Sequence, residues 1–173
     1  MKKKLCALAL CVIMVVALAA PALAAEPAPC NLVINSYTGI WLGYGATRLQ
    51  MANVYGNDTI SAGRNVTSWD DTGTDAQLWM LKNLGNENYI VSSKLRDAYG
   101  NEYVMNRNTN NNKCIVWPLS TAITADTVIV YPGPNLTQII QLKFAPLSNK
   151  YFSPDAMVNG ALISWGPTPY ETQ

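Results

Sequence analysis

Apolar and polar residues alternate over short runs along most of this chain. Such runs occur at 66–69, 89–92, 103–106 and 113–117, and four more lie between residues 127 and 165. Residues that favour turns, chiefly Gly, Pro, Asn and Asp, separate the runs. Beyond the N-terminal apolar run, no stretch of ten or more positions places apolar residues at helical spacing. The pattern predicts an all-β domain of short strands, either a barrel or a sandwich.

One arrangement of residues occurs three times. A short strand ends in an aromatic residue, a loop rich in turn-forming residues follows, and a second strand begins with Gln. The three pairs are Trp69 with Gln77, Tyr131 with Gln138, and Trp165 with Gln173. A unit of this size cannot bury its own apolar face, so three copies predict a closed, three-fold β architecture. A β-trefoil is therefore the expected fold, with a β-sandwich as the alternative.

The N-terminus has the features of a secretory signal. Lys2, Lys3 and Lys4 precede an apolar run over 5–19, and Ala22-Leu23-Ala24 supplies the small residues of a cleavage site. We predict a signal peptide over 1–24, a linker over 25–30, and a secreted domain over 31–173 with units of about 31–83, 84–145 and 146–173. The lysine-rich signal suggests a bacterial source, and an uncleaved membrane anchor is the alternative to cleavage.

Charge and composition narrow the range of partners. The chain has 12 Lys and Arg against 11 Asp and Glu. Loss of the three signal-peptide lysines leaves nine, for a mature net charge of −2. Nucleic acid is therefore not an expected partner, nor is membrane insertion after cleavage. Sparse charge with abundant Asn, Thr, Gly and Tyr favours neutral partners such as glycans.

The residue types present argue against catalysis and against bound metal. There is no histidine, which removes the commonest general base and the commonest metal ligand. Asp70, Asp71 and Asp75 lie close together but match no calcium loop, so neither a metal nor a cofactor is expected. The other carboxylates are scattered and cannot be paired from sequence. We therefore expect a protein that is not an enzyme.

Two cysteines remain after signal cleavage, Cys30 and Cys114. In an oxidising compartment they predict one disulfide, which would tie the N-terminal segment to the middle of the chain. Two free, buried thiols are the alternative.

The repeated unit resembles that of the ricin-type β-trefoil lectins. That repeat contains a Cys-Leu-Asp group, a Val-x-Leu-Trp strand and a Gln-x-Trp strand. In the middle unit the matching positions are Lys113 to Val116, Val128 to Tyr131, and Gln138 to Ile140. In the first unit they are Val66, Trp69, Gln77 and Trp79, and in the third they are Leu162, Trp165 and Gln173.

The resemblance implies roles for individual residues. Trp69, Tyr131 and Trp165 would be platforms that stack against sugar rings, with half-buried core aromatics as the alternative. Their expected polar neighbours are Asp70, Asp71 and Asp75 beside Trp69, and Asn135 beside Tyr131. The residues expected to hold the core and its loops are Gln77, Trp79, Gln138 and Gln173.

The chain departs from the family at the position of its sugar-binding Asp. Val116 stands there in the middle unit, Gln50 or Asn53 in the first, and Phe152 or Ser153 in the third, with Asp155 nearby. A galactose pocket of the usual form is therefore not expected, and any binding would depend on the aromatic residues.

Two functions fit these observations. The first is a secreted, non-catalytic carbohydrate-binding trefoil, in which the truncated third unit has the weakest site. The second is a protein-binding trefoil, such as an adhesin, a toxin-associated subunit or a protease inhibitor, whose sugar sites have decayed. Burial of all three platform aromatics would favour the second function.

Overall fold

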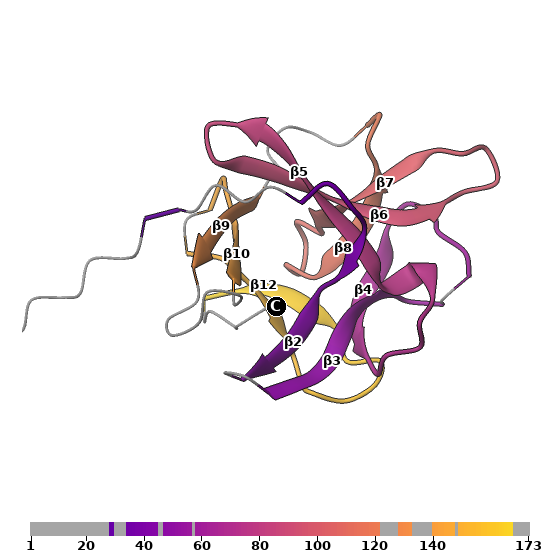
Figure 1. Ribbon diagram of the computed structural model, residues 1–173, viewed down its shortest axis with the longest axis horizontal. Helices are drawn as coiled ribbons and strands as arrows, with labels where there is room; N and C mark the ends of the chain where they lie inside the picture. Colours follow the sequence, from indigo (N-terminus) through magenta and orange to yellow (C-terminus); the bar gives the residue numbers. More distant parts are fainter. Residues whose placement is uncertain are drawn as a thin grey trace, which may run out of the picture.

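The computed structural model describes residues 28–29, 34–44, 47–56, 58–121, 128–132, 140–147 and 149–167. Figure 1 shows strands arranged around a common centre, with β9 and β10 on one side and β2, β3 and β4 on the other. Within these residues, no helix has the length and apolar character needed to cross a membrane. The predicted all-β class is confirmed.

Twelve strands and one turn of 3-10 helix make up the described chain. Their bounds are β1 (Thr38–Gly39), β2 (Trp41–Tyr44), β3 (Thr47–Val54), β4 (Arg64–Trp69), η1 (Asp75–Gln77), β5 (Leu78–Gly85), β6 (Asn88–Arg96), β7 (Glu102–Arg107), β8 (Cys114–Pro118), β9 (Val128–Pro132), β10 (Ile140–Phe144), β11 (Tyr151–Pro154) and β12 (Ile163–Gly166). The short runs identified in the sequence at 66–69, 89–92 and 103–106 lie inside β4, β6 and β7.

Five strands pair in succession and form a barrel wall. β1 pairs with β5, β5 with β6, β6 with β9, and β9 with β10, always antiparallel. The strand pattern follows from burial on one face: in β5, Trp79 and Leu81 are buried while their neighbours Leu78 and Met80 are only partly so. Alternation of this kind places one face of each strand in a shared core.

Three hairpins cover one end of this wall: β3–β4, β7–β8 and β11–β12. Their second strands meet one another. Residues 64–65 of β4 pair with 115–116 of β8, Thr67 bridges to Leu162 just before β12, and Lys113 just before β8 bridges to Ser164 of β12. Each hairpin therefore contacts the other two. The fold is a β-trefoil.

The pairing register defines the repeat more sharply than the Gln positions do. Trp69 and Trp117 hold the same place in the first two hairpins, opposite Met51 and Val104 respectively. The bridges among the second strands make Gly166 the third equivalent residue, so that Trp165 corresponds to the buried Ser68 and Val116. The structural repeat is thus 48 residues long in the first step and 49 in the second (117 minus 69, and 166 minus 117).

This register corrects the alignment of the middle unit. The residue equivalent to Trp69 is Trp117 of β8, and not Tyr131. Tyr131 lies in β9, which pairs with β6 as β5 pairs with β1. The alignment slipped because β8 and β9 are both short apolar strands that end in an aromatic residue. By the same register β10 opens the third unit, so the last boundary falls before Ile140 and not at 146.

The core is built around large aromatic side chains. Trp79, Tyr89, Phe144, Phe152 and Trp165 are its bulkiest completely buried members. The indole N–H of Trp79 donates to the backbone oxygen of Ala52 at 2.9 Å, so burial leaves this polar group satisfied.

Trp165 is not a surface platform. It is 1% exposed, and its ring lies 5.5 Å from that of Phe144 and 5.3 Å from that of Phe152. A side chain enclosed in this way cannot stack against a ligand. The prediction of a sugar platform at Trp165 is therefore wrong, because the core alternative applies there.

Cys114 is a free thiol with no exposed surface. Burial raises the pKa of this thiol, although the backbone N–H of Asn106 and the indole of Trp165 face its sulfur and act in the opposite sense. The structure thus has Cys114 without the predicted bond to Cys30, which lies outside the described residues.

We expect Trp165→Ala to lower the free energy of unfolding by about 3–5 kcal/mol, as for other large buried aromatics. Chemical denaturation followed by circular dichroism measures this change. Leu84→Ala is the matched control, because Leu84 is 54% exposed on the β5–β6 hairpin, and it should shift stability by less than about 0.5 kcal/mol. A Trp165→Ala protein as stable as the Leu84→Ala protein would contradict the core assignment.

Candidate functional site

A turn residue with positive φ precedes the second strand of each hairpin. These residues are Gly63 (φ 79°) before β4, Asn112 (φ 58°) before β8 and Gly160 (φ 81°) before β12. Each turn lies beside a tryptophan of a neighbouring unit. A methyl group on Gly160 would lie 3.3 Å from Cζ3 of Trp69, and one on Gly63 would lie 3.8 Å from Cζ3 of Trp117.

The third turn makes a backbone contact, in which Trp165 N donates to Asn112 O at 2.8 Å. The three tryptophans nevertheless differ in exposure. Trp69 and Trp117 are half-buried, whereas Trp165 is enclosed in the core. Two of the three equivalent positions, Trp69 and Trp117, therefore present part of an aromatic ring at the surface, over the turn of the adjacent unit, and the third is Gly166.

A pocket of about 420 Å³ lies beside Trp117. It is formed by the turn before β4, the end of β7 with the turn after it, and β8. Its lining residues are Gly63, Asn106, Arg107, Asn108, Thr109, Ile115, Trp117 and Thr121. One aromatic ring with amides and hydroxyls around it is a typical composition for a small-ligand site.

Asn106 is the buried polar member of the pocket. It is 7% exposed, and its Oδ1 accepts a hydrogen bond from Arg107 N at 2.6 Å. Its Nδ2 makes no hydrogen bond with any described residue. A ligand acceptor placed in the pocket would give this N–H a partner. Asn53 is the equivalent residue of the first unit, and its Nδ2 instead donates to Val54 O at 2.9 Å.

Among the described residues of the lining, Arg107 alone carries a charge. Its Nη1 donates to Asn112 Oδ1 at 2.9 Å, and the centre of its guanidinium group lies 5.2 Å from the centroid of the Phe144 ring. Its Nε is buried without a partner. In the described part of the chain no carboxylate pairs with Arg107, and the lining contains no Asp or Glu.

The surroundings of Trp69 differ from those of Trp117. Asn159 Oδ1 accepts from Asp70 N and from Gln50 Nε2, both at 2.8 Å, and Asn159 Nδ2 donates to Asp70 Oδ2 at 2.7 Å. Gln50 Oε1 is buried and has no partner among the described residues. Trp69 is thus flanked by an ordered group in which the charge is a carboxylate and the buried atom without a partner is an acceptor.

The other acidic residues near Trp69 have local partners. Asp71 Oδ1 accepts from Gly73 N at 2.9 Å, as in an Asx turn, and Asp75 forms an ion pair with Lys94 at 2.8 Å. Nowhere in the described ranges do three or more His, Cys, Asp or Glu side chains gather as a metal site would require. Of the three aspartates, only Asp70 therefore belongs to the group beside the ring.

Gln77 lies behind this loop. Its Nε2 donates to Asp70 O at 2.7 Å, and its Oε1 accepts from the backbone N and the hydroxyl of Thr72 at 2.8 and 2.9 Å. The buried amide thus ties the loop after Trp69 to the start of β5.

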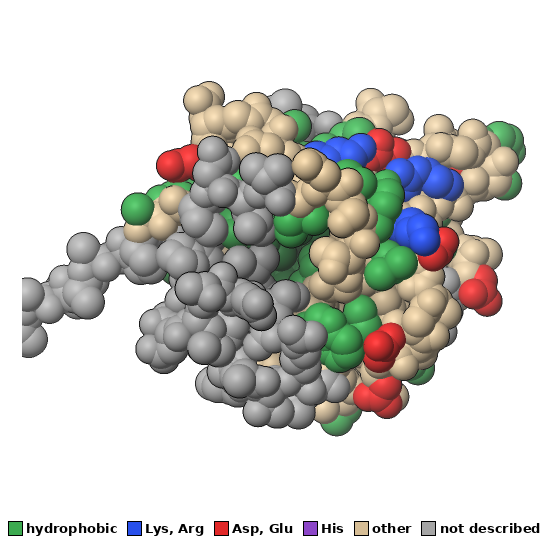
Figure 2. Space-filling view, in the orientation of Figure 1, with side chains coloured by type: hydrophobic (Ala, Val, Ile, Leu, Met, Phe, Trp, Pro, Cys, Tyr) green, Lys and Arg blue, Asp and Glu red, His purple; other side chains and the backbone are tan. Residues whose placement is uncertain are grey.

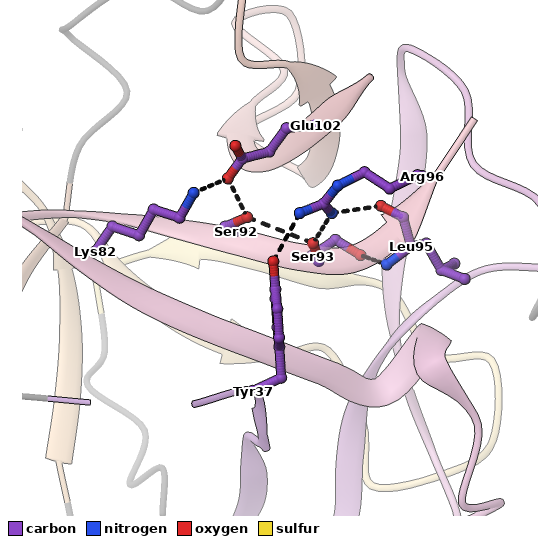
Figure 3. Close-up of polar contacts among 7 residues, drawn as sticks. All are labelled: Tyr37, Lys82, Ser92, Ser93, Leu95, Arg96 and Glu102. Atoms are coloured by element: carbon purple, nitrogen blue, oxygen red, sulfur yellow. Dashed lines mark hydrogen bonds and ion pairs between the residues drawn. The ribbon is translucent and has the colours of Figure 1, made fainter. Parts of the chain in front are cut away.

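Another polar cluster lies across β5, β6 and β7 (Figure 3). Glu102 accepts from Lys82 and, at 2.6 Å, from Ser92 Oγ. Arg96 donates to Ser93 O, to Leu95 O at 2.8 Å and to Tyr37 Oη at 2.6 Å. Partial burial disfavours the charged form of Glu102, but the bonds from Lys82 and Ser92 outweigh it and lower the pKa of this carboxyl. Because its members bond to one another, the cluster acts as a clamp between strands.

Charges of both signs are interspersed on the face shown in Figure 2, where Lys and Arg lie next to Asp and Glu. A stripe of one sign, which a nucleic-acid surface needs, is not seen on the part of this face that the structure describes.

Some predicted site residues lie outside the described residues: Asn135, Gln138 and Gln173. Tyr131 is described only as part of strand β9. Conversely, the sequence pattern did not point to Trp117 or Asn106. The 48-residue spacing of Trp69 and Trp117 was the signal that could have found Trp117.

Comparison with known proteins supports the fold. No protein-family model matches the chain, and no curated protein does. Among solved structures, the designed three-fold symmetric protein ThreeFoil superposes with a TM-score of 0.55 at 16% identity, over 72% of this chain and 89% of ThreeFoil. A mosquitocidal holotoxin superposes with a TM-score of 0.64 at 13% identity, over 83% of this chain and 18% of the toxin. The chain thus corresponds to a small part of the toxin, and at these identities the likeness concerns the fold alone.

The bonds to Glu102 in this cluster predict how the free energy of unfolding depends on pH. Because the pKa of Glu102 is lower in the folded protein than its usual 4.5, its stabilising effect is complete above pH 4.5 and is lost as the pH falls through the lower, folded value. We expect Glu102→Gln to lower the free energy of unfolding at pH 7 by about 1 kcal/mol, a modest figure because the pair is partly exposed. Denaturant titrations between pH 3 and 7 should show a smaller loss on acidification than in the parent protein.

The matched control for this pH dependence is Glu87→Gln, since Glu87 is exposed in the β5–β6 turn. Its stability profile should follow that of the parent protein. A Glu102→Gln profile parallel to the parent's at every pH would contradict the role given to the clamp.

Proposed function

We propose that this protein is a secreted, non-catalytic carbohydrate-binding trefoil of the ricin type, and that its principal site is the Trp117 pocket. The observation that carries the proposal is that one pocket is lined by the half-buried Trp117 and by the amide of Asn106, whose Nδ2 has no acceptor among the described residues. A sugar ring offers an apolar face for stacking and hydroxyl groups for hydrogen bonds. The pocket volume of about 420 Å³ suits one or two sugar residues.

The Trp69 position supports a second, shallower site. Its ring lies over Gly160 and beside the Gln50–Asp70–Asn159 group, which offers hydrogen-bond acceptors to sugar hydroxyls. Since the third equivalent position is Gly166, which has no ring, two sites rather than three are proposed. Two weak sites on one molecule raise the apparent affinity for a surface that carries many copies of a glycan.

We expect Trp117→Ala to weaken glycan binding about tenfold, which corresponds to ~1.4 kcal/mol of lost stacking. Trp117→Phe keeps an aromatic face and should retain most of the binding. Trp69→Ala should lower the number of sites per molecule in a calorimetric titration and leave the Trp117 site intact. A glycan array identifies the ligand for these titrations. Absence of binding to every mono-, oligo- and polysaccharide at millimolar concentration would overturn the proposal.

A second function, docking of a protein, is favoured by Tyr99. This side chain is 91% exposed at the tip of the β6–β7 turn, beside a pocket of about 490 Å³ that Arg96, Tyr103 and the segment 58–61 also line. Asp97 fixes the turn, because its carboxylate accepts bonds from Tyr99 N, Asn101 N, Asn101 Nδ2 and Tyr103 Oη. A rigid, exposed tyrosine is a typical anchor at protein interfaces.

If a protein is the partner, Tyr99→Ala should weaken its capture about tenfold or more, as loss of a binding hot spot does. Capture should also persist in excess free sugar. The matched control is Tyr55→Ala, at another exposed tyrosine (54%) outside this pocket. Equal capture by both variants, or its loss in free sugar, would count against the second function.

A further inference from the structure

The positive charge of Arg107 in the Trp117 pocket favours one chemical class of ligand. We propose that the Trp117 pocket selects saccharides with an anionic substituent, a carboxylate or a sulfate ester, over their neutral counterparts. This inference rests on the proposed function and specifies its ligand. Three features support it. They are the charge of Arg107, which has no counter-ion among the described residues, the amide N–H donors that have no acceptor there, and the contrast with the Trp69 position.

The first feature is a cation without a counter-ion. Arg107 is partly buried, and its contacts in the described structure are the neutral Asn112 amide and the Phe144 ring. A guanidinium group stays charged at any physiological pH. Where the surrounding dielectric is low, its field extends further than at an open surface. An anion bound in the adjoining pocket would supply the missing counter-charge, which a neutral sugar cannot do.

The second feature is the direction of the open hydrogen-bonding groups. Asn106 Oδ1 already accepts from Arg107 N, and Asn108 Oδ1 accepts from Asn110 N at 3.0 Å. The Nδ2 groups of both residues have no acceptor in the described chain. The pocket thus offers N–H donors beside a positive charge, and these groups match a substituent that carries several acceptor oxygens.

The third feature is the difference in charge between the surroundings of Trp69 and those of Trp117. At the equivalent position of the first unit, the charged group beside Trp69 is the Asp70 carboxylate, and the unsatisfied buried atom is the acceptor Gln50 Oε1. An anionic substituent would be repelled there. The two open positions share one fold and one aromatic residue type, so the difference between them isolates the contribution of the polar groups.

The test is calorimetric titration of the full secreted chain with matched pairs of ligands. Sialyllactose is compared with lactose, glucuronic acid with its methyl ester, and 6-sulfo-N-acetylglucosamine with N-acetylglucosamine. We expect the acidic member of at least one pair to bind at least about tenfold more tightly, equal to ~1.4 kcal/mol. The preference should shrink as salt rises from 20 to 500 mM, concentrations between which the screening length falls several-fold. The pairs also distinguish carboxylate from sulfate as the recognised group.

Two variants test whether the charge in the Trp117 pocket causes the preference for acidic ligands. Arg107→Gln removes the charge at similar length and should abolish the preference for acid, measured as the ratio of the affinities of each acidic and neutral pair. Thr109→Glu places a carboxylate at an exposed lining position and should reverse the preference without disturbing the buried contacts of Arg107. Lys94→Gln is the control, because it removes an exposed cation outside the pocket, and it should keep the parent preference.

The outcomes separate this inference from the proposed function. Equal binding of acidic and neutral partners, or a preference that survives both Arg107→Gln and Thr109→Glu, overturns the inference and leaves carbohydrate binding standing. A preference lost in Lys94→Gln also overturns it, since the selectivity would then come from general surface charge. Absence of binding to every member of the pairs overturns both.

Discussion

The structure depends on mutual contact among the three hairpins. No hairpin of this size is stable in water by itself, and here the second strand of each one is bridged to the second strands of the other two. Beneath them, aromatic side chains of all three units belong to one core cluster, among them Trp79 of the first unit, Tyr103 of the second, and Phe144, Phe152 and Trp165 of the third. The three-fold arrangement follows, because only a closed set of three leaves no hairpin with an uncovered apolar face.

The fold class could be predicted from the sequence, because strand length and the spacing of turn residues are local properties. The alignment of the middle unit could not, since β8 and β9 offer two nearly identical local patterns and only the pairing of Val104 with Trp117 decides between them. The burial of Trp165 could not be predicted from the sequence either. Its burial depends on Phe144 and Phe152, which lie 21 and 13 residues earlier in the chain (165 minus 144, and 165 minus 152).

The three equivalent positions, Trp69, Trp117 and Gly166, show how one scaffold holds different chemistry. The backbone requirement is shared, since each turn before the second strand has a residue at positive φ, and Gly or Asn meets it. The side chains at and around the three positions carry no such constraint. Asp70 flanks the first ring, Arg107 lies near the second, and the third position has no ring. Function thus depends on residues that the repeat leaves free to vary, which is why the fold alone does not specify a ligand.

Each open position is assembled from two units. Trp69 belongs to the first unit and Gly160 to the third, while Trp117 belongs to the second unit and Gly63 to the first. Neither position exists until the hairpins have closed around the common axis, so a ligand that binds there binds the folded state alone. Occupancy must then stabilise the whole trefoil, by an amount that grows with the logarithm of ligand concentration above Kd. The contacts that hold the units together and the contacts that would hold a ligand are therefore linked, because both depend on the same packing of a tryptophan over a neighbouring turn.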